Sequence, residues 1–475
     1  MCIDDGALRK KVAIIAFMSP KSAPKSHTML VSFAAENVRS FRDRLDFSME
    51  ATAMAEPGMA RAIPWRNEGR SLQKILPVAG VFGANASGKT TLLRAMADMR
   101  NFVRGSYAPQ RGRSDNTLKT LRKPFRLDPH YEMHPSHFEI EVILDGVRHE
   151  YGFVVDDERV LREWARWYPR GKAALLFDRE GMQLRMDRRG SKSRAIRELL
   201  REDALVLSIA DAAGLELLEP LNRWFEENLL LCDAASRESR GGYTARLMEN
   251  EDRRKQVLEL LQVADLGITD AHRRQPPQEA VEFVETVIKA LQSARKDQED
   301  DDEDGVEIRA GDLHHIELSH RGTHGSVPFH ISEESLGTVV WLGLVGPLLD
   351  ALMGGHVLLV DELEASLHPL LVEQFVRLFQ NRESNPHGAQ LIFNSHEARL
   401  LGNSAEDRVI GRDQAWFAEK LPDGSTQLFS LVDLNPRKSE AIAKRYLAGR
   451  YGATPILSST EFTALAALMT TDIPR

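Results

Sequence analysis

The chain has 475 residues, of which 42% are hydrophobic, so it can bury a large core divided among roughly two to four domains. Its formal net charge of −8 excludes a globally basic nucleic-acid-binding protein. Its two cysteines, Cys2 and Cys232, exclude a disulfide scaffold and a cysteine-based zinc site, and they suit a cytoplasmic protein.

The N-terminal residues predict a leader that stays outside the fold. Residues 12–18 are apolar and follow three basic residues, faintly like a signal peptide, but the polar stretch SPKSAPKS comes next. Met29 looks like a more natural start, so we expect residues 1–28 to be a disordered leader or an over-extended gene start. No apolar run approaches the roughly 18 residues of a membrane span, and we expect no membrane partner.

Residues 77–91 read PVAGVFGANASGKTT and predict a phosphate-binding loop. An apolar strand (78–82) leads into G-x-x-x-x-G-K-[ST] at 83–90, and a helical pattern follows to about residue 103. Backbone N–H groups of such a loop cradle phosphate oxygens. Lys89 would reach the β- and γ-phosphates of ATP, and Thr90 would ligate Mg²⁺. The alternative is a glycine-rich turn that binds nothing.

The residues that we expect to contact the nucleotide in this loop are Gly83, Ala84, Asn85, Ala86, Ser87, Gly88, Lys89, Thr90 and Thr91. A hairpin precedes the loop, with strands near 30–33 and 44–49. Its residues Arg39 and Phe41 have two interpretations of equal weight. Either they lie near the nucleotide base, or Phe41 is an ordinary core residue.

The next segments predict an antiparallel layer followed by helices. Alternating residues at 138–144 and 150–155 flank Asp145-Gly146, a hairpin signal, and strands continue at 160–168 and 174–177. From residue 193 apolar residues recur at spacings of three and four, which predicts helices. Basic residues at 185–201 form a candidate DNA contact or a solvated face, and the acidic stretch 296–304 predicts a disordered bridge.

The C-terminal part predicts a second group of site residues. Strand-like residues return at 306–308, 315–318 and 327–331. Residues 332–338 read SEESLGT and open a helix through 349, which puts Ser335 and Gly337 at a helix N-terminus that can bind anions. Residues 356–362 read HVLLVDE, a buried strand that ends in two acids. Asp361 would hold Mg²⁺ and Glu362 would act as general base on water. The alternative is a strand ending in surface acids.

A further strand is predicted at 390–393, after an amphipathic helix at 370–379. It ends in Asn394-Ser395-His396 and should lie beside the strand of Asp361. A lone histidine is usually structural, but this position favours contact between His396 and the γ-phosphate.

The motifs GANASGKT, ESLGT, LLVDE, SLHP and NSH, in this order, resemble those of ABC-type ATPases, in the clade of SMC and DNA-repair ATPases. RDQAWFAEK (412–420) and YLAGRYG (446–452) are similar to segments of bacterial AAA family ATPases related to the overcoming-lysogenisation-defect (OLD) proteins, which often serve in anti-phage systems. The resemblance implies Walker B residues at Asp361 and Glu362, a D-loop at 366–368 and a switch histidine at His396.

The resemblance also implies the architecture. We expect an α/β P-loop NTPase of ABC type, with a mixed sheet, flanking helices and an antiparallel β layer. Its halves would be residues 29–192 and 306–475, separated by a helical insertion at 193–305 that ends in the acidic linker. The sequence after His396 is too short for the Toprim nuclease of OLD proteins, so an effector nuclease or toxin would be a separate protein.

The implied activity is Mg-dependent ATP hydrolysis in a homodimer or higher homo-oligomer. Ser335 and Gly337 of one protomer would cap the ATP held by the other. An SMC-like ATPase that engages DNA is the principal alternative. A non-hydrolysing scaffold is disfavoured by the intact Lys89, Asp361 and Glu362, and a transporter ATPase by the absence of a predicted membrane domain.

Overall fold

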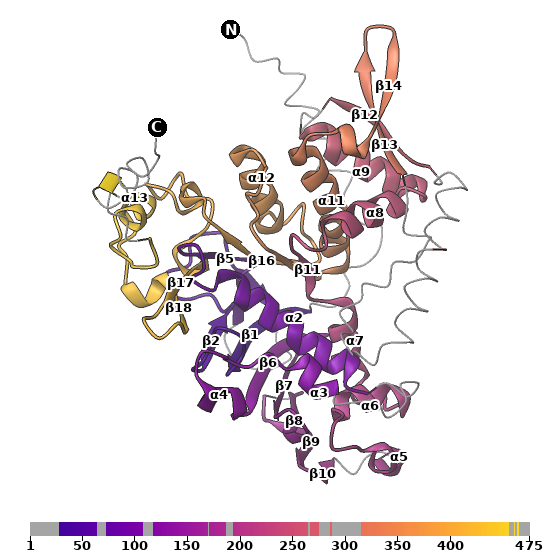
Figure 1. The fold of residues 1–475 in the computed structure, drawn as a ribbon, viewed down its shortest axis with the longest axis vertical. Coiled ribbons are helices and arrows are strands. Elements are labelled where there is room, and N and C mark those ends of the chain that lie inside the picture. Colours follow the sequence, from indigo (N-terminus) through magenta and orange to yellow (C-terminus); the bar gives the residue numbers. More distant parts are fainter. Residues whose placement is uncertain are drawn as a thin grey trace, which may run out of the picture.

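The computed structural model describes residues 28–63, 73–107, 117–169, 171–186, 193–264, 267–274 and 315–455, with positions 286, 460, 463 and 464. The predicted leader (apart from residue 28), the acidic linker and the strand at 306–308 lie outside this part of the chain. The described residues form two large sheets and two small ones (Figure 1).

The first large sheet is antiparallel and has the strand order β10-β9-β8-β7-β6-β1-β2. Its strands are β1 (Met29–Glu36), β2 (Leu45–Ser48), β6 (Ser136–Leu144), β7 (Val147–Val155), β8 (Val160–Tyr168), β9 (Ala174–Glu180) and β10 (Gln183–Met186). The predicted hairpin between β6 and β7 is confirmed. Asp145 and Gly146 have φ of 52° and 72°, the left-handed conformation that this tight turn requires.

The second large sheet, here called the central sheet, has the order β11-β15-β16-β5-β17-β18. Its strands are β5 (Val78–Phe82), β11 (Leu230–Cys232), β15 (Val357–Val360), β16 (Gln390–Ser395), β17 (Ala415–Lys420) and β18 (Thr426–Ser430). The first five strands in the order are parallel, and β18 is antiparallel to β17. The carboxyl ends of the five parallel strands therefore meet at one edge, where ligands bind in such sheets.

Alternate residues of the central sheet face two different cores, because successive side chains of a strand point to opposite faces. Ala79 and Val81 of β5 join the core that contains α2 and the antiparallel sheet, whereas Val78 and Phe82 join the core that contains α11 and α12. Figure 1 shows α2 on one side of β5 and β16, and α11 and α12 on the other. This double burial explains why β5 and β15 are uniformly apolar.

The remaining elements complete these layers. The α-helices are α2 (Lys89–Gly105), α3 (Thr117–Leu121), α4 (Pro129–Met133), α5 (Ser193–Leu199), α6 (Val206–Ala212), α7 (Glu219–Glu227), α8 (Arg237–Leu247), α9 (Glu251–Val263), α11 (Leu336–Gly354), α12 (Pro369–Gln380) and α13 (Ile442–Leu447). The small sheets contain β3 (Arg61–Ile63) with β4 (Gln73–Ile75), and β12 (Ile268–Arg274), β13 (His315–Gly322) and β14 (Gly325–His330). The described residues also form the 3₁₀ helices η2 (Ile331–Glu333), η3 (Ala398–Leu401), η4 (Arg412–Gln414) and η5 (Leu431–Leu434).

The segment predicted to be helical, 193–305, is not helical throughout. It contains β11, which pairs with β15 at the edge of the central sheet, and β12, which pairs with β13. Leu229 lies within the predicted helical segment, but α7 ends at Glu227 and Leu229 has φ of 61°, which a helix does not allow. A short apolar run fits both helical and strand patterns, and pairing with β15 decides between them.

Helix α11 is the one described helix that is long and apolar enough to cross a membrane, with a mean hydropathy of 1.7. The expectation that no segment approaches the composition of a membrane span therefore does not hold for this helix. However, 72% of its most apolar window is buried inside the protein, against α8, α9 and the central sheet. A core helix passes the same composition test.

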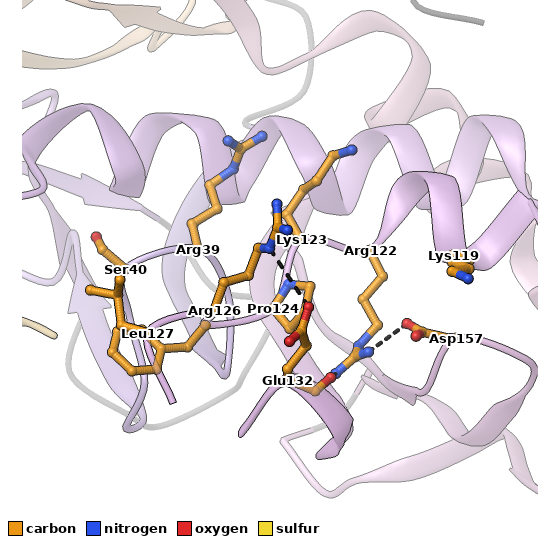
Figure 2. A pocket seen from close by; sticks show the side chains of 11 residues that line it. Arg39, Ser40, Lys119, Arg122, Lys123, Pro124, Arg126, Leu127, Glu132 and Asp157 are labelled. Atoms are coloured by element: carbon orange, nitrogen blue, oxygen red, sulfur yellow. Dashed lines mark hydrogen bonds and ion pairs between the residues drawn. The ribbon is translucent and has the colours of Figure 1, made fainter. Parts of the chain in front are cut away.

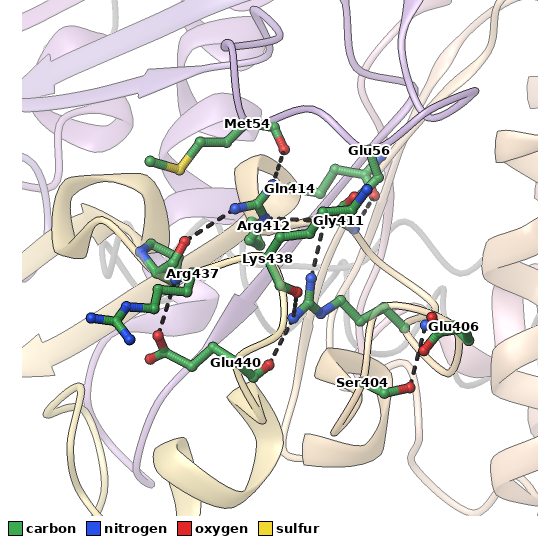
Figure 3. A network of polar contacts seen from close by, with 12 residues as sticks. Met54, Glu56, Ser404, Glu406, Gly411, Arg412, Gln414, Arg437, Lys438 and Glu440 are labelled. Atoms are coloured by element: carbon green, nitrogen blue, oxygen red, sulfur yellow. Dashed lines mark hydrogen bonds and ion pairs between the residues drawn. The ribbon is translucent and has the colours of Figure 1, made fainter.

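A buried ionic network connects the segment before β3 to the segment between β16 and β17 (Figure 3). Glu56 Oε1 accepts hydrogen bonds from Arg408 Nη1 and Arg412 Nε, each at 3.0 Å. Both arginines also donate to backbone carbonyls, including that of Met54 and that of Glu440. Because one carboxylate pairs with two guanidinium groups that are almost fully buried, this network fixes the two segments together.

Candidate functional site

The predicted loop at 83–90 connects β5 to α2, as the motif requires. Lys89 is 6% exposed, and its Nζ donates to the carbonyl oxygens of Gly83 at 3.0 Å and Ala84 at 2.9 Å. Burial lowers the pKa of Lys89, and three nearby carboxylates oppose this shift: Glu364, then Glu362, then Asp361. The ammonium group of Lys89 therefore lies over the loop, where these two carbonyl oxygens bind it.

The two motif glycines are required by close contacts. A Cβ on Gly83 would lie 2.4 Å from the carbonyl oxygen of Ala418. Gly88 has φ of 102°, and its Cβ would lie 2.2 Å from Thr426 Oγ1. Ser87 Oγ is buried and has no hydrogen-bond partner among the described residues. A glycine cradle, an unpartnered hydroxyl and a buried lysine together fit a polyphosphate chain.

Thr90 and Asp361 meet at the carboxyl edge of the central sheet, although 271 residues separate them. Thr90 Oγ1 donates to Asp361 Oδ1 at 2.7 Å. Asn394, at the end of β16, donates its Nδ2 to the same Oδ1 at 2.5 Å. A hydroxyl beside a carboxylate fits Mg²⁺, which usually completes its coordination with phosphate and water oxygens rather than with a protein cage. Within the described ranges, no group of three or more His, Cys, Asp or Glu forms such a cage.

Glu362 is the second residue of the turn that follows β15, here called the Walker B turn (361–367). Its φ is 53°, a left-handed conformation that is costly for a residue other than glycine. Its backbone N–H donates to Asn394 Oδ1 at 2.5 Å, which holds this conformation. The side chain of Glu362 is exposed at the mouth of the site, where a general base for water has to lie.

His396 begins the segment after β16, here called the switch segment (396–402). β16 lies between β15 and β5, so the histidine follows the strand that separates Asp361 from the glycine loop. Its side chain is exposed and lines a cleft of about 500 Å³. Its backbone N–H donates to Glu364 Oε1 at 2.6 Å, which connects the switch segment to the Walker B turn.

A comparison with protein families identifies the chain. The sequence profile described as "AAA domain, putative AbiEii toxin, Type IV TA system" matches residues 78–402, more than half of the chain. The chain belongs to this AAA family. No curated protein matches the sequence.

Several solved structures resemble this AAA-domain protein at low identity. "Crystal structure of the SmcHead bound to the C-winged helix domain of ScpA" is 11% identical, with a TM-score of 0.42, and the match covers 86% of this chain and 99% of that one. The "SMC head domain from Thermotoga maritima" is 11% identical, with a TM-score of 0.37, 84% of this chain and 98% of that one. The fold itself is the expected α/β P-loop NTPase fold, with a mixed central sheet, an antiparallel sheet and the strand–loop–helix unit.

Ser335 and Gly337 lie at the N-terminus of α11 in this AAA domain, as the sequence predicts. Ser335 Oγ accepts a hydrogen bond from the backbone N–H of Thr338 at 3.2 Å and so caps the helix. A Cβ on Gly337 would lie 2.8 Å from the carbonyl oxygen of Ser366, so the glycine permits contact with the Walker B turn. In the described part of the chain, no hydrogen bond joins either residue to the glycine loop of the same protomer.

A basic cleft of about 610 Å³ opens beside the glycine loop of the AAA domain (Figure 2). Ser40 lines it and donates its Oγ to Thr91 Oγ1 at 3.1 Å. Arg39 lines it too and pairs with Asp98 of α2 at 2.5 Å. The other lining residues are Lys119, Arg122, Lys123, Pro124, Phe125, Arg126, Leu127, Glu132 and Asp157. Phe41 is fully buried in the core, which confirms the structural interpretation of this residue.

Sequence reasoning did not assign roles to Asn394, Glu364 and Ser40. Asn394 is fully buried and directly follows three apolar residues of β16, and a buried amide in that place needs partners. That signal could have identified it. Glu364 and Ser40 carry no such signal, because their roles depend on contacts with His396 and Thr91.

Proposed function

We propose that this protein binds Mg-ATP at the carboxyl edge of the central sheet and hydrolyses it. The observation that carries the proposal is the contact of Thr90 with Asp361, because it joins the glycine loop to the acidic strand end. Lys89 and the loop amides would bind the phosphates. Thr90 and Asp361 would hold Mg²⁺, which would neutralise charge on the transferred phosphoryl group.

The remaining steps belong to side chains of the chain itself. Glu362 is exposed next to Asp361 and would accept a proton from the attacking water. His396 would donate to the γ-phosphate from the neighbouring strand end. Ser40 and Arg39 line the basic cleft and Ser40 contacts Thr91, so this cleft would hold the nucleoside.

We further propose that the active form is a homodimer with composite sites. Ser335 caps α11, Gly337 lies beside the Walker B turn, and among the described residues neither has a hydrogen bond to the glycine loop of the same chain. The N-terminus of this 19-residue helix would then contact the ATP held by a second copy. A higher homo-oligomer built from such pairs is compatible with the same geometry.

The test compares wild type with Glu362→Gln in Mg-ATP, and records molar mass in solution together with phosphate release. We expect phosphate release by the wild type, a loss of about 100-fold or more in the variant, as general-base catalysis contributes, and accumulation of an ATP-bound dimer. Glu373→Gln is the matched control, because Glu373 lies on α12 in a partly exposed pair with Arg377. A variant that hydrolyses ATP like the wild type would overturn the assignment of Glu362.

The biological role that we propose is control of a separate effector, a nuclease or toxin, in bacterial anti-phage defence. The family description, which names a putative toxin of a type IV TA system, supports it. An effector that co-purifies with the ATP-bound Glu362→Gln dimer, and not with nucleotide-free protein, is the expected result. Absence of any nucleotide-dependent partner would count against it.

A DNA-engaging ATPase of SMC type is the second candidate function. The basic cleft favours it, because Lys119 and Lys123 line the cleft without an ion pair among the described residues. This function predicts that duplex DNA stimulates phosphate release and that the stimulation falls steeply with salt. The effector role predicts neither effect.

A further inference from the structure

Glu364 has an environment that the proposed hydrolysis does not use. It lies in the Walker B turn, three residues after Asp361, and its Oε1 accepts the backbone N–H of His396 at 2.6 Å. Its Oε2 is buried and has no hydrogen-bond partner among the described residues. A buried carboxylate oxygen without a donor destabilises a fold, so the residue is not explained by stability.

The charge around Lys89 makes the position of Glu364 more unusual. Glu362 and Asp361 already supply the two carboxylates that the site needs, and Glu364 adds a third. A third negative charge weakens the binding of a polyphosphate. The presence of Glu364 at this site therefore needs another explanation. What it does in the structure is hold the first residue of the switch segment.

Two hydrogen bonds between a side chain and a backbone N–H are among those that join β16 and the switch segment to the Walker B turn. Asn394 Oδ1 accepts the N–H of Glu362, and Glu364 Oε1 accepts the N–H of His396. In the first contact the accepting side chain belongs to β16, and in the second it belongs to the Walker B turn. Together they fix the general-base candidate and the histidine to one another through the backbone.

We propose that Glu364 is a positioning residue for the hydrolysis reaction, which holds His396 at the mouth of the nucleotide site by accepting its backbone N–H. This inference rests on the proposed function. The role needs a hydrogen-bond acceptor at Oε1 and does not need the negative charge. The variant Glu364→Gln should therefore retain the positioning role, whereas Glu364→Ala should lose it.

The experiment uses the full-length protein and the variants Glu364→Ala and Glu364→Gln, with Glu373→Ala as the matched control on the exposed face of α12. Hydrogen exchange of the His396 amide is measured without nucleotide, and steady-state phosphate release gives kcat and KM for ATP. A lost hydrogen bond to a charged group predicts exchange about 10-fold faster or more in Glu364→Ala, with kcat lower by a similar factor. Glu364→Gln and the control should keep the exchange rate and kcat of the wild type, and KM for ATP should fall in both Glu364 variants, because each removes a negative charge from the phosphate site.

Each other outcome overturns the inference. Slow exchange and full kcat in Glu364→Ala would show that the carboxylate holds nothing. An equal loss of kcat in Glu364→Gln would assign the charge itself a chemical role. If Glu364→Ala does not fold, Glu364→Gln still decides, because loss of protection in that variant contradicts the role of the acceptor. The exchange measurement does not require ATP. If Glu364→Ala loses protection of the His396 amide but the wild type does not hydrolyse ATP, the proposed function is refuted and the contact between Glu364 and His396 is established.

Discussion

Asn394→Ala is the perturbation that tests the geometry of the site most directly. Asn394 is fully buried, and its amide makes both contacts that align the Walker B residues. Nδ2 donates to Asp361 at 2.5 Å, and Oδ1 accepts from the N–H of Glu362 at 2.5 Å. Alanine removes both contacts and adds no clash.

The magnitude follows from these two bonds. A hydrogen bond to a charged group contributes about 1.5–3 kcal/mol, and a buried N–H without an acceptor costs about 1–3 kcal/mol. Thr90 still donates to Asp361, so we expect the total loss of stability to be about 2–4 kcal/mol, from the same range of values. Glu362 would also lose the contact that holds its left-handed backbone, and kcat should fall by about 100-fold, the order that general-base catalysis contributes.

The assays are chemical denaturation and steady-state phosphate release, with Asn101→Ala on the exposed side of α2 as the matched control. Asn394→Asp adds a sharper comparison. A second carboxylate beside Asp361 costs about 4 kcal/mol at 4 Å and an effective dielectric constant of about 20, and Mg²⁺ should offset part of this cost. If Asn394→Ala retains the stability and kcat of the wild type, the reasoning from these hydrogen bonds is wrong.

Three further predictions concern other parts of the fold. Gly88→Ala should weaken nucleotide binding at least about 10-fold, measured by titration with a fluorescent nucleotide, since its Cβ would collide with Thr426; Gly58→Ala has a similar positive φ but open space, and isolates the clash from the strain. Glu56→Gln should cost about 3–5 kcal/mol in denaturant unfolding, because it leaves two buried guanidinium groups without a carboxylate. Burial raises the pKa of Asp413 to about 6, so its contribution to stability is present below its ordinary pKa and lost as the pH rises through about 6. The wild type should therefore lose up to about 3 kcal/mol of unfolding free energy between pH 4 and pH 8 relative to Asp413→Asn, which has no carboxyl group to ionise at this position.

The elements that carry motifs could be predicted from the sequence, because each combines a short apolar run with a polar end of fixed spacing. β5 with its glycine loop and β15 with its two acids are the main cases. Their burial on both faces leaves no alternation, and the motif at the end decides that they are strands. Helix α11 was predicted from its start at Ser335, although it extends to Gly354 rather than to 349.

The contacts that complete the site could not be predicted in the same way. β11 enters the central sheet through pairing with β15, and nothing within its three residues distinguishes it from the helices around it. Asn394 obtains its role from partners that are 32 and 33 residues away in sequence, and Glu364 from a partner that is 32 residues away. Sequence periodicity reports which face of an element is buried, and it does not report which strand ends are neighbours.

The wall of the glycine loop comes from residues beyond the family match, which ends at residue 402. Thr426 Oγ1 donates to the carbonyl oxygen of Ser87 at 2.9 Å, and β17 pairs with β5 directly. The rings of Phe417 and Tyr446 pack against that of Phe82, the last residue before the loop. Because these contacts leave no room for a Cβ at either motif glycine, the C-terminal strands determine the shape of the loop as much as the motif does. The nucleotide-binding unit therefore extends at least to α13, and a fragment that ends with the family match would retain every motif residue but lose one wall of the site.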